Sequence, residues 1–219
     1  MATIAELQQK LLSEIAAAVT QYGFGPKPKG QSFRMKTPFG WASVHLAFIT
    51  HEPSDFDITV DVSLRIDAVE NLIHEEDNLL SRAEKLQTAT IGCELGNMSE
   101  GRQKRWNIAS DEAVKQVSES IRNAIVSIAL PYIERYSNLE DALDALSSND
   151  KSGWLHSPIH DARCRRALAL AFVLGKHDQV KGIIGRNEKF LKSRNDGGLA
   201  AFQSLANKIL NKVFSQSDK

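Results

Sequence analysis

Four aspartates lie within the thirteen-residue stretch "DFDITVDVSLRID", which runs from Asp55 to Asp67. Carboxylates bind metal ions and act as general acids or bases, so a row of them is a candidate catalytic site. On a β-strand, residues two apart are separated by about 6.6 Å and residues four apart by about 13 Å. Asp55 and Asp57 could therefore share a metal ion, whereas Asp61 would need a second ligand from a neighbouring strand.

The alternation around these aspartates favours a simpler interpretation. Polar and apolar residues alternate strictly from Asp55 to Ile66, which is typical of a strand with one buried face and one solvent-facing face. Cross-strand pairing with cationic neighbours accounts for the aspartates without a metal ion; the expected neighbours are Arg34, Lys36 and His45. We therefore interpret the row as a surface that faces solvent or a partner.

A second constellation, "HSPIHDARCRR", contains His156, His160 and Asp161. Histidines four apart share one face only within a continuous helix. Ser157 and Pro158 have the residue types of an N-cap and a first helical residue, so His156 is expected to precede the helix. We predict capping or surface histidines here and no metal site.

Motifs that define common enzyme classes are absent from the sequence. There is no phosphate-binding G-x-x-x-x-G-K-[ST] or G-x-G-x-x-G, no G-x-S-x-G and no H-E-x-x-H. Cys93 and Cys164 have no metal-ligand spacing and are expected to be buried, reduced thiols. We accordingly predict a protein that is not an enzyme, with no catalytic residues, no metal and no cofactor.

The net charge of zero hides a strong segregation of charge along the chain. Residues 67–150 carry 16 acidic and 8 basic side chains, whereas residues 151–219 carry 5 acidic and 13 basic ones. Such asymmetry indicates either two parts that attract one another or a charged surface for a partner. The basic residues fall on several sides of at least two expected helices, so solvated faces or docking onto the acidic region are favoured over nucleic-acid contact; they include Arg163, Arg165, Arg166, Lys176, Lys181, Arg186, Lys189, Lys192 and Arg194.

The elements that would position these residues form an α+β pattern, an N-terminal helix on a five-stranded antiparallel sheet followed by a helical C-terminal half. Thr3 and Glu6 form a capping box for the first helix, which Gly23 ends. Asp67 is expected to cap the segment after the third strand, and Pro131 to kink or end the long helix that begins at Ser110. The five strands are expected over 31–37, 41–51, 55–66, 86–95 and 102–109, with turns at 38–40, 52–55 and 97–101.

The organisation and location of the chain follow from composition. We expect an α+β domain over residues 1–147, a linker over 148–158 that is rich in Ser, Asn, Asp and Gly, and a helical module over 159–215 that is separate or packed on the first domain. The amphipathic N-terminus lacks the pattern of a secretory signal, and no apolar run is long enough to cross a membrane. We therefore expect a cytoplasmic protein without a membrane partner.

Several structural landmarks resemble a bacterial family, domain of unknown function 4304, over roughly residues 5–146. They are Gly23-Phe24, Phe33-Arg34, Trp41, the strand to Ile66, Trp106, and Leu130-Pro131 before an acidic helix. The resemblance implies a bacterial protein with this α+β arrangement and no known activity. By general analogy, small α+β families of this kind often act as immunity proteins against bacterial toxins.

The function expected from these observations is non-catalytic protein binding, in its most specific form an immunity protein that neutralises a toxin by direct contact. Segregated charge speeds association and selects partners, so the acidic residues are the expected contacts for a basic toxin: Asp55, Asp57, Asp61, Glu140, Asp141 and Asp144. One alternative is a metal-dependent hydrolase or nuclease that uses the aspartate face with His45. The other is a nucleic-acid-binding accessory protein that uses the basic C-terminal helices.

Overall fold

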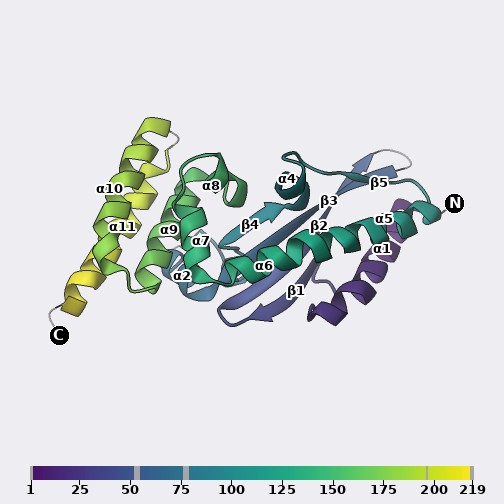
Figure 1. Ribbon diagram of the computed structural model, residues 1–219, viewed down its shortest axis with the longest axis horizontal. Helices are drawn as coiled ribbons and strands as arrows, with labels where there is room; N and C mark the ends of the chain where they lie inside the picture. The colour runs from purple at the N-terminus through teal and green to yellow at the C-terminus, as the bar shows by residue number, and fades with distance from the viewer. Residues whose placement is uncertain (1, 52–54, 76–78, 196, 218–219) are drawn as a thin grey trace. The chain divides into compact units, whose positions relative to one another are not determined.

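The computed structural model describes residues 2–51, 55–75, 79–195 and 197–217, and it has the expected α+β fold (Figure 1). An N-terminal helix and an antiparallel sheet of five strands are followed by a helical C-terminal half. The chain forms two compact units, one of residues 1–64 with 92–137 and the other of residues 65–91 with 138–219. Part of the predicted turn at 52–55, residues 52–54, lies outside the described residues.

The first unit is built on the sheet, whose strand order is β1-β2-β3-β4, with β5 also paired to β3. The strands are β1 (Ser32–Thr37), β2 (Gly40–His51), β3 (Asp55–Ile66), β4 (Ile91–Glu94) and β5 (Trp106–Ile108). β1 and β2 form a hairpin in which Phe33 lies opposite Val44, and β5 places Ile108 opposite Phe56. All four of these side chains are fully buried, so the alternation predicts the buried face of the sheet correctly.

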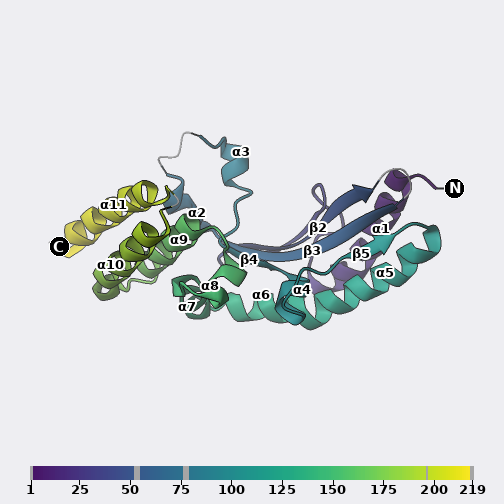
Figure 2. The ribbon, with the colours of Figure 1, turned by 90° about the horizontal axis from the view of Figure 1, so that it is seen from above.

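Helices of the first unit cover the apolar face of this sheet (Figure 2). The helical segments are α1 (Ile4–Val19), η1 (Thr20–Tyr22), α4 (Leu95–Ser99), α5 (Asp111–Ala124), η2 (Ile125–Ala129) and α6 (Leu130–Tyr136). The capping box of Thr3 and Glu6 is present at the start of α1, and Gly23 ends η1 in a left-handed conformation with φ 89°. Ser110 caps α5 as predicted. Because these signals are local, the sequence predicts these three helix ends correctly.

Pro131 does not end the long helix. α5 continues through η2, a π-helical segment, into α6, and Pro131 lies in the first turn of α6. A proline lacks the N–H that an α-helix interior needs, and here it directly follows the π-helical segment.

The predicted strand over 86–95 and the predicted turn over 97–101 are both wrong in extent. Only Ile91–Glu94 form β4, and a short helix, α4, follows at once. Glu94 explains the change, because its carboxylate accepts hydrogen bonds from the backbone N–H groups of Gly96, Asn97 and Lys104. A carboxylate that caps N–H groups in this way initiates a helical turn.

The second unit is helical. Its elements are α2 (Asp67–Ile73), α3 (Arg82–Lys85), α7 (Leu139–Ser147), α8 (Lys151–His156), α9 (His160–Val173), α10 (His177–Arg194) and α11 (Leu199–Ser217). The segment expected to be a linker, residues 148–158, lies in this unit and includes α8. Gly153 of α8 lies so close to the Ser148 carbonyl oxygen that a Cβ atom has no room there. The predicted division into domains stays a prediction.

Two buried charged groups organise the second unit. The Arg65 guanidinium, 1 % exposed, donates to Asp67, to Asn71, to the Lys85 carbonyl and to both the carbonyl and hydroxyl oxygens of Thr88. Asp67 is therefore not the N-cap predicted from the sequence; Ile66 occupies that position, and the Asp67 carboxylate serves Arg65 instead.

The other buried charge is the carboxylate of Glu70, which is fully buried. Its Oε1 accepts a hydrogen bond of 3.0 Å from Arg166 of α9, and its Oε2 lies 3.4 Å from Nε2 of His74. Burial acts to raise the pKa of Glu70, but the hydrogen bond from His74 and the charge of Arg166 outweigh it and lower the pKa to about 2.

Candidate functional site

The face of the sheet opposite the helices is polar. On β3 it carries the alternating polar residues, and the register of β1 with β2 brings Ser32 opposite His45 and Arg34 opposite Ser43. Hydrogen bonds cross the strands here, with 2.9 Å between Ser32 Oγ and His45 Nδ1 and 3.0 Å between the hydroxyls of Ser43 and Ser63. Among the described residues of the first unit, no helix lies on this face (Figure 2). We call it the polar sheet face.

One end of the polar sheet face holds a hydrogen-bonded carboxylate cluster. Asn107 Nδ2 donates to Asp55 Oδ2 at 2.9 Å and to Asp57 Oδ1 at 3.0 Å. Asp57 Oδ2 also lies 3.1 Å from His51 Nε2 and 3.7 Å from Arg105 Nη1. The hydrogen bond from Asn107, with smaller contributions from His51 and Arg105, lowers the pKa of Asp57. Asn107 thus holds the two aspartate side chains in a fixed arrangement.

The partners of these aspartates differ from those predicted. The expected cations were Arg34, Lys36 and His45, yet Asp57 pairs with His51 and Arg105. The antiparallel pairing of β5 with β3 places Asn107 opposite Asp57, which brings the 105–107 segment to this end of the sheet. The sequence predicts a strand over 102–109 but not its pairing with β3, and this pairing is what brings Asn107 and Arg105 to Asp57.

Asp61, further along β3, has the opposite environment. It is half-buried, and within the described ranges no side chain or backbone group donates a hydrogen bond to its carboxylate. Burial raises its pKa; His45, which was expected to face it, opposes this rise, and Glu94 of β4 adds to it. A half-buried carboxylate without a donor costs stability, so Asp61 is the residue of this face whose presence the fold itself does not explain.

We therefore expect amide substitutions at Asp57 and Asp61, two positions on one face of one strand, to have opposite effects. Asp57→Asn removes charge-assisted hydrogen bonds and should lower the free energy of unfolding by about 1–2 kcal/mol. Asp61→Asn removes a half-buried charge that desolvation disfavours and should leave the free energy of unfolding at neutral pH unchanged or higher. Urea denaturation of both variants and the wild type measures this difference.

The pH dependence of the same variants provides a control. Asp57, with a lowered pKa, stabilises the protein above the ordinary value of 3.8 and loses this effect as the pH falls through its folded value. Asp61, with a raised pKa, carries a penalty at neutral pH that disappears once the pH is below 3.8. Equal destabilisation by the two substitutions at pH 7 would contradict these assignments.

The other end of the polar sheet face is aromatic and basic. The Arg34 guanidinium carbon lies 4.1 Å from the centroid of the Trp41 ring, and Lys36 lies opposite Trp41 in the β1–β2 register. Tryptophan and arginine are the side chains most enriched at the energetic centres of protein interfaces. From the sequence Trp41 is only a landmark, because a single tryptophan in a strand does not reveal which face it occupies relative to its neighbours.

The alternation predicts that the polar face is exposed to solvent, but part of this face is buried. Thr59 is 4 % exposed, and Arg65, at the end of the same alternation, is 1 % exposed. Period-two alternation identifies which side chains share a face, but other segments of the chain decide whether that face is covered.

The candidate metal ligands do not converge. Within the residues that the structure describes, no group of three or more His, Cys, Asp or Glu side chains is placed to hold a metal ion. His156 ends α8 and His160 begins α9, whose N-cap is Ile159 and not the predicted Ser157. The His160 ring packs against two aromatic rings, with centroid distances of 5.4 Å to Trp154 and 5.2 Å to Phe190. His160 is thus part of an aromatic cluster.

Both cysteines are buried thiols that form no disulfide. Burial raises the pKa of Cys93 to about 12, and the carboxylates of Glu94 and Asp61 add to this effect. A thiolate is the nucleophilic form of cysteine, so the Cys93 sulfur is protonated and unreactive at neutral pH.

The remaining predicted contacts, Glu140, Asp141 and Asp144, lie on α7 in the second unit. Asn138 caps this helix. Glu140 Oε2 forms an ion pair of 2.8 Å with Lys176, and the hydrogen bond to Glu140 raises the pKa of Lys176. The structure therefore divides the six predicted contacts between two compact units.

Ion pairs within the second unit join the acidic and basic parts of the sequence. Besides Glu140 with Lys176, Glu70 pairs with Arg166 at 3.0 Å, and Glu75 pairs with Lys208 at 2.6 Å. Part of the segregated charge is consequently neutralised inside this unit, which is one of the two outcomes that the charge pattern allowed.

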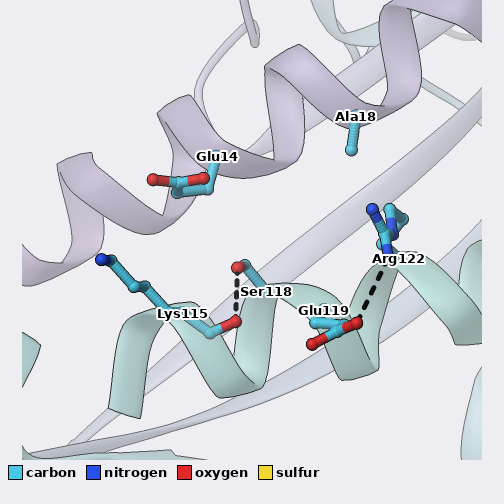
Figure 3. A pocket seen from close by; sticks show the side chains of 6 residues that line it. All are labelled: Glu14, Ala18, Lys115, Ser118, Glu119 and Arg122. Atoms are coloured by element: carbon cyan, nitrogen blue, oxygen red, sulfur yellow. Dashed lines mark hydrogen bonds and ion pairs between the residues drawn. The ribbon is translucent and has the colours of Figure 1, made fainter. Parts of the chain in front are cut away.

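A groove of about 270 Å³ lies between α1 and α5 (Figure 3). Its lining residues are Glu14, Ala18, Lys115, Ser118, Glu119 and Arg122. Glu119 Oε1 lies 3.5 Å from Arg122 Nη2, and the Ser118 hydroxyl donates a hydrogen bond to the Lys115 carbonyl. Because both charge signs are present and partly paired, the groove has no concentrated charge with which to select a ligand.

The fold and the polar sheet face define an α+β protein with a helix-covered sheet and a polar opposite surface. Residues 15–135, more than half of the chain, match the family described as Domain of unknown function (DUF4304), and the chain belongs to this family. The matched range runs from α1 to α6 and includes the polar sheet face. No curated protein and no solved structure matches the chain. In the described residues, no helix is long and apolar enough to cross a membrane.

Proposed function

We propose that this chain is a non-catalytic protein-binding module that docks a basic protein partner on the polar sheet face. More specifically, we propose that it is an immunity protein that neutralises a bacterial toxin by direct binding. The observation that supports it best is the carboxylate of Asp61, which is half-buried on that face and for which the described residues supply no donor.

Charge complementarity identifies the chemistry of the partner. An arginine or lysine side chain of the partner would supply the donor that Asp61 lacks, and Glu94 lies close enough to add to the attraction for a cation. A charge-assisted hydrogen bond of this kind is stronger than a neutral one. The cost that Asp61 imposes on the free protein is then offset only in the complex.

The arrangement of the face also favours tight binding. Asn107 holds Asp55 and Asp57 together, and these side chains lose little conformational freedom when a partner binds. At the other end, Trp41 with Arg34 provides an aromatic and cationic anchor. An acidic side chain or an aromatic ring of the partner would complement that end.

A two-stage experiment tests this proposal. The tagged full-length chain first captures a stoichiometric partner from the source cells, and the affinity of the purified partner for wild type and Asp61→Asn is then measured by calorimetry. We expect Asp61→Asn to weaken binding about tenfold or more, because it removes a charge-assisted hydrogen bond in a desolvated contact. Glu134→Gln, the same loss of charge at an exposed position on α6 of the first unit, should bind like the wild type.

The toxin-neutralising form of the proposal has its own readout. The partner expressed alone should arrest growth, co-expression of the wild-type chain should restore it, and Asp61→Asn should restore it less. Wild-type affinity in Asp61→Asn would overturn the assignment of the polar sheet face. A partner that binds through this face but is harmless when expressed alone would overturn only the immunity role.

A further inference from the structure

The exposed face of α10, in the second unit, is strongly basic. The helix buries Val180, Ile183, Asn187 and Leu191, and its opposite face carries four exposed cations, Lys181, Arg186, Lys189 and Lys192. With 3.6 residues per turn, these four lie within one arc of the helix surface. Of the two acidic residues of α10, Asp178 lies in the first turn on the same side of the helix as the cations, and Glu188 accepts a hydrogen bond from Gln203 of α11.

These four cations differ from the other basic residues of the unit. Arg166, Lys176 and Lys208 form ion pairs with carboxylates of the same unit. Within the part of the chain that the structure describes, no carboxylate pairs with any of the four cations on α10. The sequence predicts basic residues on several sides of at least two helices; the structure shows that four of them share one face of α10.

Two partly exposed aromatic rings lie beside cations of α10. The Lys181 ammonium lies 5.4 Å from the centroid of the Phe214 ring, which is 53 % exposed. The Arg194 guanidinium lies 5.5 Å from the centroid of the Trp154 ring, which is 37 % exposed. Contact with the His160 ring keeps Trp154 in place.

Two glycines lie between these cations. Gly182 and Gly185 are in the interior of the helix, where glycine costs roughly 0.5–1 kcal/mol relative to alanine. A Cβ atom at Gly185 would meet nothing within 4 Å, and one at Gly182 would meet only the flexible end of Arg186 at 3.7 Å. Packing within the fold therefore does not require either glycine, and both positions leave the helix backbone open to close approach.

We propose that the exposed face of α10, with Phe214 beside it, binds single-stranded nucleic acid. Clustered cations on one face contact successive phosphates, and exposed rings stack on unpaired bases. A duplex satisfies the cations but keeps its bases stacked inside, so the exposed ring of Phe214 favours a single strand. This site lies in a different compact unit from the polar sheet face and uses none of its residues.

Fluorescence anisotropy with a labelled oligouridylate of about 20 nucleotides tests the inference on the full-length chain. Binding should weaken with salt, with a slope of log K against log salt of about −2 to −3, as expected for three to four phosphate contacts. Lys181→Glu with Lys189→Glu should weaken binding by about tenfold or more at low salt. Phe214→Ala should weaken it without any change in charge.

The matched control carries the same charge change on the first unit, Lys27→Glu with Lys115→Glu, both at exposed positions. It should bind the oligonucleotide like the wild type, and so should Asp61→Asn, whose effect is confined to the polar sheet face. Equal affinity of the α10 double variant and the wild type would overturn the inference. So would binding of a duplex as tight as that of the single strand, because it would reveal attraction to any polyanion.

Discussion

Replacing Arg65 with methionine should lower the free energy of unfolding by about 3–5 kcal/mol, the largest effect we expect from a single substitution in this chain. The guanidinium is 1 % exposed and donates to the carbonyls of Lys85 and Thr88. Methionine has a similar length but no donor, so these carbonyls would be left without their hydrogen bond from residue 65. Urea denaturation followed by circular dichroism measures the loss.

Two further variants separate the role of the hydrogen bonds from that of the charge. Arg65→Lys keeps the positive charge but cannot reproduce the planar fork of donors, so it should recover only part of the lost stability. Arg82→Met makes the same chemical change at an exposed position on α3 and should shift the free energy of unfolding by no more than about 0.5 kcal/mol. Similar losses for Arg65→Met and Arg82→Met would show that the Arg65 network does not stabilise the fold.

Replacing Glu70 with glutamine should lower the free energy of unfolding at pH 7 by about 3 kcal/mol, because the pKa of this buried carboxyl is lowered from 4.5 to about 2. Glutamine keeps the shape of the side chain but loses the charge that faces Arg166 and His74. Since the folded state binds the proton less tightly than the unfolded state, the stabilisation is complete above pH 4.5 and is lost as the pH falls toward 2.

The measurement for Glu70 is a series of denaturation curves between neutral and acidic pH for the wild type and Glu70→Gln. The difference in the free energy of unfolding should be constant above the ordinary pKa of a glutamate and should shrink steadily below it. Glu75→Gln is the matched control, because Glu75 pairs with Lys208 but its side chain is 51 % exposed; its cost should stay below about 1 kcal/mol. If the difference in the free energy of unfolding between wild type and Glu70→Gln did not change with pH, the lowered pKa of Glu70 would not be the source of the stabilisation.

Most of the fold was predictable because it is encoded in short periodicities. The alternation from Asp55 to Ile66 predicts β3 with its bounds, and the capping box at Thr3 predicts the start of α1. The predictions that were wrong have both local and distant causes. The neighbours of Asp67 predict a cap, whereas its carboxylate accepts a hydrogen bond from Arg65. The predicted fourth strand ends where the Glu94 carboxylate caps the turn that follows, and Arg65 binds the Thr88 carbonyl near its expected start.

The candidate site was predictable as a surface but not in its chemistry. The sequence places Asp55, Asp57 and Asp61 on one face, and the structure agrees. It could not distinguish the hydrogen-bonded Asp57 from the unsatisfied Asp61, because the difference depends on Asn107, which is 50 residues from Asp57 along the chain. Nor could it separate the cations that pair inside the second unit from those left on the α10 face.

The sequence by itself thus determined the α+β class, the apolar faces of the strands and helices, and the family of the chain, since local hydrophobic patterns and capping residues carry this information over a few residues. Only the tertiary structure decided which polar side chains are exposed, paired or buried. The physical reason is that the free energy of a charge depends on the groups within a few ångströms of it. Around Arg65, Glu70 and Asp61, several of those groups come from parts of the chain far away in sequence.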